Sequence, residues 1–547
     1  MNQVSGESQR LQRLAWWASC FLISLVVAVP MVAVLTSLVL SGDTEWGHIR
    51  TVLLPEYLNN TFWLMVQVGT YSLLLGVGTA WLTASCVFPG HRWLRWGLTL
   101  PLAMPAYVMA YVYTDLLDFS GPVQNALRSA LGLEFDVAVL PEIRSLTGAA
   151  FVMSLSLFPY VYLLARVGFL QRSTKLFNAA RTLGASPFRA FAKIALPASR
   201  ASIAGGLTLV LMETLADFGV VEYFGVPTFS TGIFRTWFAN GDKLAAMKLA
   251  AVMFVFVIVL VVAEKLNRRT AYRSELEMEG SASPIHLRGW QAMVATCFCA
   301  IPVLLGSAIP IASLLQMAIE SGDPLLGGAF AGFAANSVAV SLGAALLTVG
   351  VALILTYGQR LSRHWSTDGT IHIATLGYAL PGTMLAVGLI PPVSSLDQSL
   401  AGFFEDQLGW RTGLILSGTV FLLVYAYLCR FLTVAHNTTH SAASAIPPVY
   451  EQAARTLGAS SKRVAFAIHF PLIRRAIMTA TLLVFVDGMR ELPATLLLRP
   501  FNFETLATRV YRLAADERLA EASSAALAIV AIGLIPVFLL NRQKTAE

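Results

Sequence analysis

The chain has 547 residues, of which 56% are hydrophobic and 13% are charged, whereas soluble domains carry about 25% charged residues. This balance excludes a soluble globular protein, and the net charge of +7 comes without the basic, aromatic-rich stretches that would indicate nucleic-acid binding. The five cysteines fall in apolar segments and the eight histidines do not cluster at metal-ligand spacing, so no metal site is assigned.

Apolar runs long enough to cross a bilayer as helices, about 20 residues each, recur along the whole chain. The first follows Arg10 and Arg13 and is too long for a signal peptide, so an uncleaved span is predicted. The sequence therefore predicts an all-α membrane protein with about 12 transmembrane helices. The predicted spans are 14–40, 62–88, 97–116, 146–166, 203–222, 245–264, 291–319, 334–357, 370–391, 412–434, 476–498 and 521–540.

One eight-residue sequence occurs twice, at Ala179–Ser186 and at Ala453–Ser460, 274 positions apart. Since 274 is about half of the chain, the sequence indicates two copies of one unit. An even number of spans in each copy makes the two copies parallel. The predicted domains are a first six-helix repeat at 1–264, a polar cytoplasmic linker at 265–289 and a second six-helix repeat at 290–547.

The orientation follows from the distribution of positive charge. If the N-terminus is inside, 24 of the 38 Lys and Arg residues fall in the cytoplasmic segments and ten in the outer segments, as the positive-inside rule requires. Both termini and both copies of the repeated sequence are therefore predicted to be cytoplasmic.

Each copy of the repeated sequence predicts a helix-turn-helix element outside the bilayer. Gly184 and Gly458 can end the first short helix in a left-handed conformation, and Pro197 and Pro471 are predicted to end the second. The small side chains would let another protein approach closely, and the alternative is an interfacial element without a partner. The candidate docking residues are Ala179, Ala180, Arg181, Gly184, Ala185 and Pro197, and in the second copy Ala453, Ala454, Arg455, Gly458, Ala459 and Pro471.

Charged residues also lie within two predicted spans, 203–222 and 476–498, where carboxylates repeat at offset 274. A charge inside a bilayer is costly and by default marks a functional or paired group. The candidates for a translocation path or gate are Glu213, Asp217, Asp487, Arg490 and Glu491. The alternative is a salt bridge between helices in which Arg490 neutralises one of the carboxylates.

Two further pairs of residues repeat at offset 276. Asn60 and Asn336, each followed by a hydroxyl residue, are predicted to cap the N-termini of two spans. Pro105 and Pro381 are predicted to kink two other spans, either as packed kinks or as part of a pathway.

The outer stretches that follow the fifth and eleventh spans also match at offset 274. They offer cationic and aromatic side chains in both halves, as a docking surface would, although ordinary interface aromatics and snorkelling arginines remain the alternative. The candidate docking residues are Arg235, Trp237, Asp242, Arg509, Tyr511 and Asp516.

The repeated sequence, followed by Ile194 or Ile468 and then by proline, resembles the EAA loop of binding-protein-dependent ABC importer permeases. The resemblance implies a permease whose two cytoplasmic loops dock on two copies of a separate ABC ATPase, with a periplasmic solute-binding protein as the outer partner. In place of the family's usual glutamate stand Asn178 and Gln452, with Glu451 one residue earlier. This departure puts an ion pair to the ATPase at that position in doubt.

The segments around Asp217 and around 490–509 resemble the fused, two-repeat ferric iron permeases. This resemblance implies a bacterial inner-membrane permease for ferric iron. A periplasmic ferric-iron-binding protein would deliver the iron to it. Thiamine, phosphonate or polyamine stay open as solutes, as does an ion-gradient-driven secondary transporter. The chain has no Gly-(x)4-Gly-Lys-Ser/Thr loop and no catalytic constellation. We therefore expect no enzymatic activity and no cofactor in this chain, with ATP and Mg on the partner subunits.

Overall fold

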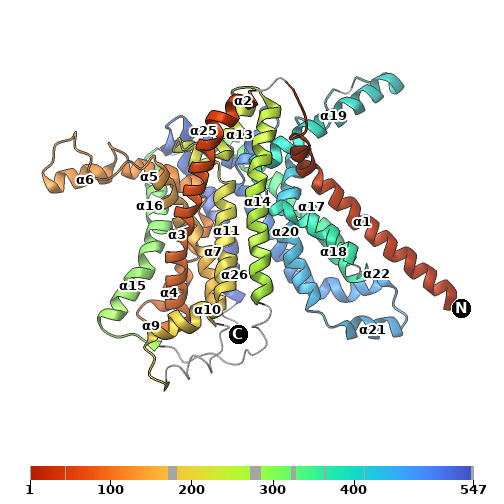
Figure 1. Ribbon diagram of the computed structural model, residues 1–547, viewed down its shortest axis with the longest axis horizontal. Coiled ribbons are helices and arrows are strands. Elements are labelled where there is room, and N and C mark those ends of the chain that lie inside the picture. The colour runs from red at the N-terminus through yellow and green to blue at the C-terminus, as the bar shows by residue number, and fades with distance from the viewer. Residues whose placement is uncertain are drawn as a thin grey trace. The chain divides into compact units, whose positions relative to one another are not determined.

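The computed structural model describes residues 2–42, 45–170, 182–271, 285–321, 328–362, 365–411 and 413–543 (Figure 1). Within these ranges, nine helices are long and apolar enough to cross a membrane, or up to eleven if each of two bent helix pairs is one span. The only strands in the described residues are β1 (Cys86–Val87) and β2 (Ile285–His286), which pair in parallel. The predicted all-α membrane fold is confirmed, and the count is consistent with about 12 spans.

The helices preceding residue 272 are α1 (Asn2–Thr36), α2 (Trp46–His48), α3 (Leu54–Ser85), α4 (His91–Gly97), α5 (Ala106–Leu117), α6 (Pro122–Leu131), α7 (Leu146–Leu170), α9 (Pro187–Ala190), α10 (Leu196–Ala198), α11 (Arg200–Ala216), α12 (Gly219–Tyr223), α13 (Phe229–Phe238) and α14 (Lys243–Ala271). The helices following it are α15 (Trp290–Val303), α16 (Ile309–Glu320), α17 (Gly328–Ser362), α18 (Trp365–Ala374), α19 (Gly382–Leu408), α20 (Val420–Ser444), α21 (Pro448–Thr456), α22 (Ser461–Val464), α23 (Phe470–Arg490), α24 (Pro493–Leu498), α25 (Leu506–Ala515) and α26 (Leu519–Gln543).

The chain divides into two compact units, each built around a triangle of long helices. In the unit of residues 44–245, 252–326 and 509–547, α3, α7 and α11 pack against one another. Glycine permits this close packing, since a Cβ at Gly76 would lie 2.6 Å from the Cβ of Val161, and one at Gly206 would lie 2.8 Å from the Cα of Val161. Small residues at helix contacts are the usual device for close approach in a membrane.

In the other unit, of residues 1–43, 246–251 and 327–508, α17, α20 and α23 form the corresponding triangle. Helix α1 packs on α17, α18 and α19 in this unit, and the backbone of Gly388 lies against the backbone of Pro30. Conversely, α15 and α16 pack on α4, α5 and α26 in the first unit. Each unit therefore combines the core helices of one predicted repeat with the leading helices of the other. The domain boundaries drawn from the sequence repeat stay a prediction.

The predicted span 97–116 is not a continuous helix. It begins at the end of α4, passes through a 3-10 turn at Leu100–Ala103 and resumes as α5, with Pro105 as the N-cap residue of α5. Pro381 likewise precedes α19 after a 3-10 turn, where the chain bends by 117°. The predicted kinks are therefore complete breaks, because both prolines adopt an extended backbone conformation that no helix can continue through.

The prediction that Asn60 and Asn336 cap their own helices is wrong. Helices α3 and α17 begin earlier, and both asparagines lie within them. Their side-chain amides instead donate to the carbonyl oxygens of Pro227 (3.0 Å) and Glu504 (3.1 Å), just before α13 and α25. The same contact is made in both halves, so the repeated asparagine holds a distant outer segment and does not begin a span.

Candidate functional site

The repeated element is described most fully in its second copy. Ala453, Ala454 and Arg455 belong to α21, and Gly458 follows with φ of 81°. The N–H groups of Gly458 and Ala459 donate to the carbonyl oxygens of Arg455 and Ala454, 3.0 Å each. This pattern is a Schellman cap, which requires the left-handed conformation at the glycine. The predicted glycine cap is confirmed.

The first copy shows the same left-handed glycine. Gly184 has φ of 86°, and Ala185 follows it outside regular structure. The preceding candidates Ala179, Ala180 and Arg181 lie outside the described residues. A Cβ at either glycine would meet no atom within 4 Å. The requirement for glycine therefore comes from the backbone conformation and not from crowding.

The prediction that the second helical run of each element ends at the proline is wrong. Pro471 lies in the first turn of α23 and Pro197 in the first turn of α10, each directly after a π-helical turn, Ala465–His469 or Phe191–Ala195. A proline fits the first turn of a helix because its missing N–H has no partner there. The element therefore leads straight into the span in the second copy.

The tips of both elements expose a large apolar side chain. Leu183 and Leu457 are 87% and 88% exposed, and no residue of α21 is buried. An apolar side chain this exposed at the same position of both copies is suited to contact with another protein.

Glu451 in α21 is bound within the chain. Its carboxylate accepts from the guanidinium of Arg360 at 3.4 Å and from that of Arg455 at 2.6 Å. Arg360, at the end of α17, also donates to the carbonyl oxygens of Ala443 (2.5 Å) and Ile446 (3.3 Å), which lie at and just beyond the end of α20. One arginine thus ties the repeated element to two spans. Sequence reasoning missed Arg360, because the repeat places Cys86 or Ala84 at its position in the first half.

The carboxylates predicted within the spans lie at breaks. Asp217 directly follows α11 and Glu491 directly follows α23, both with extended backbone. Asp217 Oδ1 accepts from the N–H of Val220 at 3.0 Å, and Glu491 Oε1 accepts from the N–H of Ala494 at 3.2 Å. The two residues therefore begin the short helices α12 and α24 in the same way, at the same repeat offset. Since Asp217 lies beyond the end of α11, it does not share a helical face with Glu213, although the spacing of four residues would place them on one face of a continuous helix.

Two ion pairs accompany these breaks in the second half. Arg490 pairs with Asp487 one turn earlier in α23, so this salt bridge lies within one helix and not between helices, as the alternative had it. Glu491, nearly buried, pairs with Arg430 of α20 at 3.3 Å. A Cβ at Gly382 would lie 2.6 Å from Glu491 Oε1 and 2.8 Å from Arg430 Nη1, so only glycine fits beside this pair. Sequence reasoning missed Arg430, although an arginine in the middle of an apolar span is itself a signal. Glu213 is partly buried on α11.

The outer docking candidates of the first half lie on α13 and just beyond it. Arg235 is partly exposed and pairs with Glu222 at 3.2 Å, whereas Trp237 is buried. Asp242 accepts from the N–H of Ala245 (2.9 Å) and, through its other oxygen, from the N–H of Glu45 (2.9 Å). Its carboxylate therefore fixes the start of α14.

In the second half, Arg509 is buried, Tyr511 is partly buried and Asp516 is exposed. Burial raises the pKa of the Tyr511 phenol to about 12, so this side chain is neutral at physiological pH. Of the six candidates, only those with exposed polar atoms could contact a partner in this conformation, and Trp237 and Arg509 are covered.

The N-terminal caps of α13 and α25 give an alignment of the two outer stretches that differs from the alignment predicted from the sequence repeat. Thr228 and Thr231 bond reciprocally at the start of α13, and Thr505 and Thr508 do so at the start of α25. These pairs match at offset 277, three residues from the predicted 274. Arg235 therefore corresponds to Arg512 and not to Arg509.

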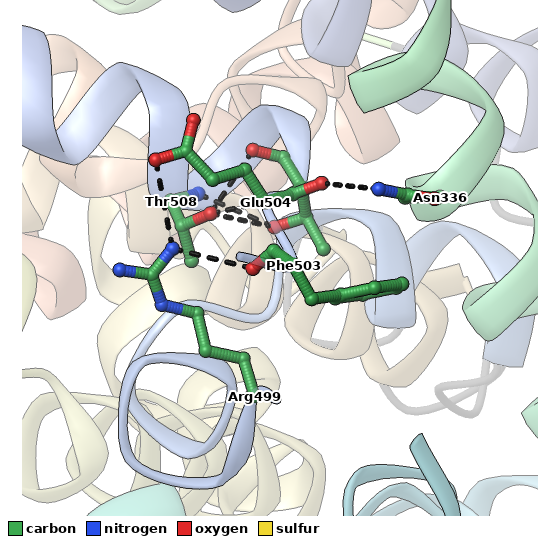
Figure 2. A network of polar contacts seen from close by, with 6 residues as sticks. Asn336, Arg499, Phe503, Glu504 and Thr508 are labelled. Atoms are coloured by element: carbon green, nitrogen blue, oxygen red, sulfur yellow. Dashed lines mark hydrogen bonds and ion pairs between the residues drawn. The ribbon is translucent and has the colours of Figure 1, made fainter. Parts of the chain in front are cut away.

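Figure 2 shows the polar network that holds the start of α25. Asn336 donates to the carbonyl oxygen of Glu504, and Arg499 reaches the carbonyl oxygen of Phe503 at 3.3 Å and the carboxylate of Glu504 at 3.7 Å. Ser337 accepts from the N–H of Leu506 at 2.7 Å, as Thr61 does from that of Phe229 at 3.4 Å. The loop before α25 is thus anchored to α17 inside the same unit.

Comparisons with known proteins match this architecture. The family model described as "Binding-protein-dependent transport system inner membrane component" matches residues 72–272. The Fe(3+)-transport system permease protein FbpB 2 of Haemophilus influenzae is 27% identical over 97% of this chain and 99% of its own length. The molybdenum transport system permease protein ModB of the same organism is 30% identical over 30% of this chain and 70% of its own length. A putative ferric transport system permease protein, FbpB 1, also from Haemophilus influenzae, is 21% identical over 90% of this chain and 78% of its own length. With its apolar helices, its duplicated eight-residue element and these relatives, the chain belongs to the binding-protein-dependent inner-membrane permeases of ABC importers.

Proposed function

We propose that this permease imports ferric iron. The observation that carries the proposal is the match along nearly the whole of both chains to the FbpB 2 permease, whose name assigns it to Fe(3+) transport. The ModB relatives match less than half of this chain, one repeat's length. The fused architecture is thus shared with the relative named for iron.

The charges at the membrane-embedded breaks support a cationic solute. Asp217 and Glu491 stand at equivalent breaks, and Glu213 and Asp487 lie one turn earlier in the same two chain segments. Arg430 pairs with Glu491, and Arg490 pairs with Asp487. Carboxylate oxygens are hard ligands that suit small, highly charged cations. Carboxylates repel an anion such as molybdate, the solute for which the ModB relatives are named.

The proposed mechanism uses separate partners at the two faces. A loaded periplasmic binding protein docks on the outer segments around α13 and α25, and two cytoplasmic ATPase copies hold the repeated elements. Closure of the ATPases on ATP moves α21 and its counterpart, and this movement changes the access of the central path. The ATPases carry ATP and Mg and do the bond chemistry, while this chain only changes conformation. Both termini lie on the cytoplasmic side in this proposal.

Reconstitution tests the solute directly. Proteoliposomes containing the permease, its ATPase and its binding protein are expected to accumulate radioactive iron supplied as Fe(III), with ATP required inside and no dependence on an ion gradient. Molybdate, thiamine, a phosphonate or a polyamine in tenfold excess should not compete. Uptake of one of these solutes in place of iron would contradict the iron assignment, and gradient-driven uptake without ATP would contradict the class of transporter.

The Arg360 contacts predict a specific role in this coupling. Arg360→Ala removes two bonds to backbone carbonyls and one to the carboxylate of Glu451, and hydrogen bonds to charged groups are worth about 1.5–3 kcal/mol each. We expect ATP-driven uptake to fall about tenfold or more while ATP hydrolysis continues, because α21 would move without α17 and α20. The measurement is the number of solute molecules taken up per ATP hydrolysed.

Gln359→Ala is the matched control, since Gln359 is the neighbouring residue on α17 but bonds to Asp368 of α18. Its uptake per ATP should equal that of the unmodified protein. An equal loss in both variants would mean that the end of α17 matters only for folding.

A further inference from the structure

Each half of the chain carries an outer hairpin in which polar side chains point inward and large apolar side chains point outward. The first hairpin consists of α6 and the segment returning through residues 132–145, and the second consists of the C-terminal part of α19 and the segment returning through residues 409–419. In Figure 1, α6 runs away from α5 and α16 at the end opposite to α15 and α4. The end of α19 likewise runs away from its own unit at the end opposite to α21.

The interior of the first hairpin is polar. Gln124 and Arg128, one turn apart on α6, are 2% and 3% exposed. Gln124 Oε1 accepts from the N–H groups of Val139 (3.0 Å) and Leu140 (3.2 Å) in the returning segment. The Arg128 guanidinium donates to the carbonyl oxygens of Phe119 and Val137, and to the side-chain oxygen of Asn125, and lies over the rings of Phe119 and Phe135.

The second hairpin repeats this design with a carboxylate. Asp397 on α19 is fully buried and accepts from the N–H groups of Ile415, Leu416 and Ser417 at 2.7 to 3.1 Å, and from the Ser417 hydroxyl at 2.5 Å. The pairs correspond between the halves, since Asp397 lies 273 positions after Gln124, and Ile415 and Leu416 lie 276 positions after Val139 and Leu140. A buried polar side chain therefore fastens the returning segment in both hairpins.

Large apolar side chains are exposed on both hairpins beside charged ones, which are Glu134, Asp136 and Glu142 in the first and Glu405, Asp406 and Arg411 in the second. The large hydrophobic residues exposed on them include Leu131, Leu133, Phe135 and Val137 in the first, and Phe403, Leu408, Trp410, Leu414 and Ile415 in the second. In water, folding drives such side chains inward and leaves polar ones outside. Segments that expose large apolar and charged side chains together, as these do in both halves, suit the boundary between water and lipid.

We infer that the two outer hairpins lie in the outer interface of the lipid bilayer, with their exposed apolar side chains inserted between lipid headgroups and acyl chains. Three features favour lipid over a soluble partner. The second hairpin continues α19, one arm of a bent membrane span, and the first follows α5 after four residues, so both are continuous with the lipid-facing surface. Both run sideways from the outer ends of their units, as helices lying along a membrane do. Their exposed residues include Trp and Phe, which are favoured at membrane interfaces.

The insertion is tested with a fluorescent label on single cysteines in nanodiscs. Leu131→Cys and Leu408→Cys are introduced into a Cys297→Ala background, since the other four cysteines are buried. Bimane on each position is then challenged with lipids that carry a nitroxide near the headgroup, and separately with iodide in water. The expected result is at least a twofold loss of fluorescence with nitroxide lipid and little loss with iodide.

Phe501→Cys supplies the matched control, because Phe501 is a large apolar residue that is 93% exposed on the outer loop before α25. The inference is overturned if nitroxide lipid quenches the label at positions 131 and 408 no more strongly than at position 501. Iodide access at 131 and 408 that disappears only when the soluble binding protein is added would overturn it too, and would assign the hairpins to that protein. The result does not depend on which solute is carried.

Discussion

Gly458→Pro is expected to abolish ATP-driven uptake while the protein still inserts into the membrane. Proline fixes φ near −65°, whereas Gly458 has φ of 81° and its N–H donates within the Schellman cap. Forcing this substitution costs about 3 kcal/mol or more, which must be relieved by rearranging the turn between α21 and α22. The exposed tip at Leu457 would then no longer be presented in the same place. We expect uptake to fall about 100-fold or more.

The matched control is Gly132→Pro. Gly132 also has positive φ, at 65°, and a Cβ there would meet no atom within 4 Å, but it ends α6 on the outer side. The two substitutions impose the same local strain on opposite faces of the membrane. Co-purification with the ATPase and stimulation of its hydrolysis should be lost in Gly458→Pro and kept in Gly132→Pro. Normal stimulation in the Gly458 variant would refute the docking role of the repeated element.

The fold class could be predicted from sequence because two signals can be read directly along the chain. Apolar runs of span length and an identical eight-residue sequence at offset 274 require no knowledge of packing. The left-handed glycines could also be predicted, since a helix end followed by Gly458 leaves few alternatives. These features depend on the chain's own local chemistry.

The helix breaks and the packing partners could not be predicted in this way. Nothing local shows that Asn60 reaches Pro227, or that Asn336 reaches Glu504, because these bonds join segments 167 and 168 residues apart. The predicted span 97–116 continued across Pro105 because the segment is apolar throughout. In the structure, Pro105 and the 3-10 turn before it divide this segment. A constant repeat offset also failed near α25, where a shift of three residues between the halves appears only through the threonine caps.

The candidate site shows the same limit. The carboxylates Asp217 and Glu491 were found because they repeat, whereas Arg430 and Arg360 were missed because they do not. At offset 274 the first half has Ser156 in place of Arg430 and Cys86 in place of Arg360. A comparison of two halves detects what duplication preserved. The residues that make one half different from the other emerge only from their contacts.

Removing Arg430 is expected to cause the largest loss of stability of any single substitution at the membrane-embedded charges. Arg430 and Glu491 are 11% and 5% exposed in their side chains and pair at 3.3 Å beside Gly382. Arg430→Met would leave the Glu491 carboxylate buried without its counter-charge, and breaking a buried pair in this way costs about 3–5 kcal/mol. A well-packed apolar replacement of both partners is far less costly, because no buried charge remains. The double variant Arg430→Met/Glu491→Met should therefore recover much of the lost stability. The recovery is incomplete because Glu491→Met also removes the acceptor for the N–H of Ala494.

Thermal unfolding of the purified permease in nanodiscs, followed by the reactivity of its buried cysteines, measures these differences. The exposed pair of Arg411 and Glu405, at 3.0 Å with side chains 87% and 54% exposed, is the matched control. Arg411→Met should change stability by about 1 kcal/mol or less, since solvent screens such a pair. If Arg430→Met is as mild as Arg411→Met, or if the double variant is as unstable as the two single losses combined, the pair does not stabilise this break. A double variant that folds but no longer transports would assign the pair to the path itself, because stability and uptake would then have separated at the same two residues.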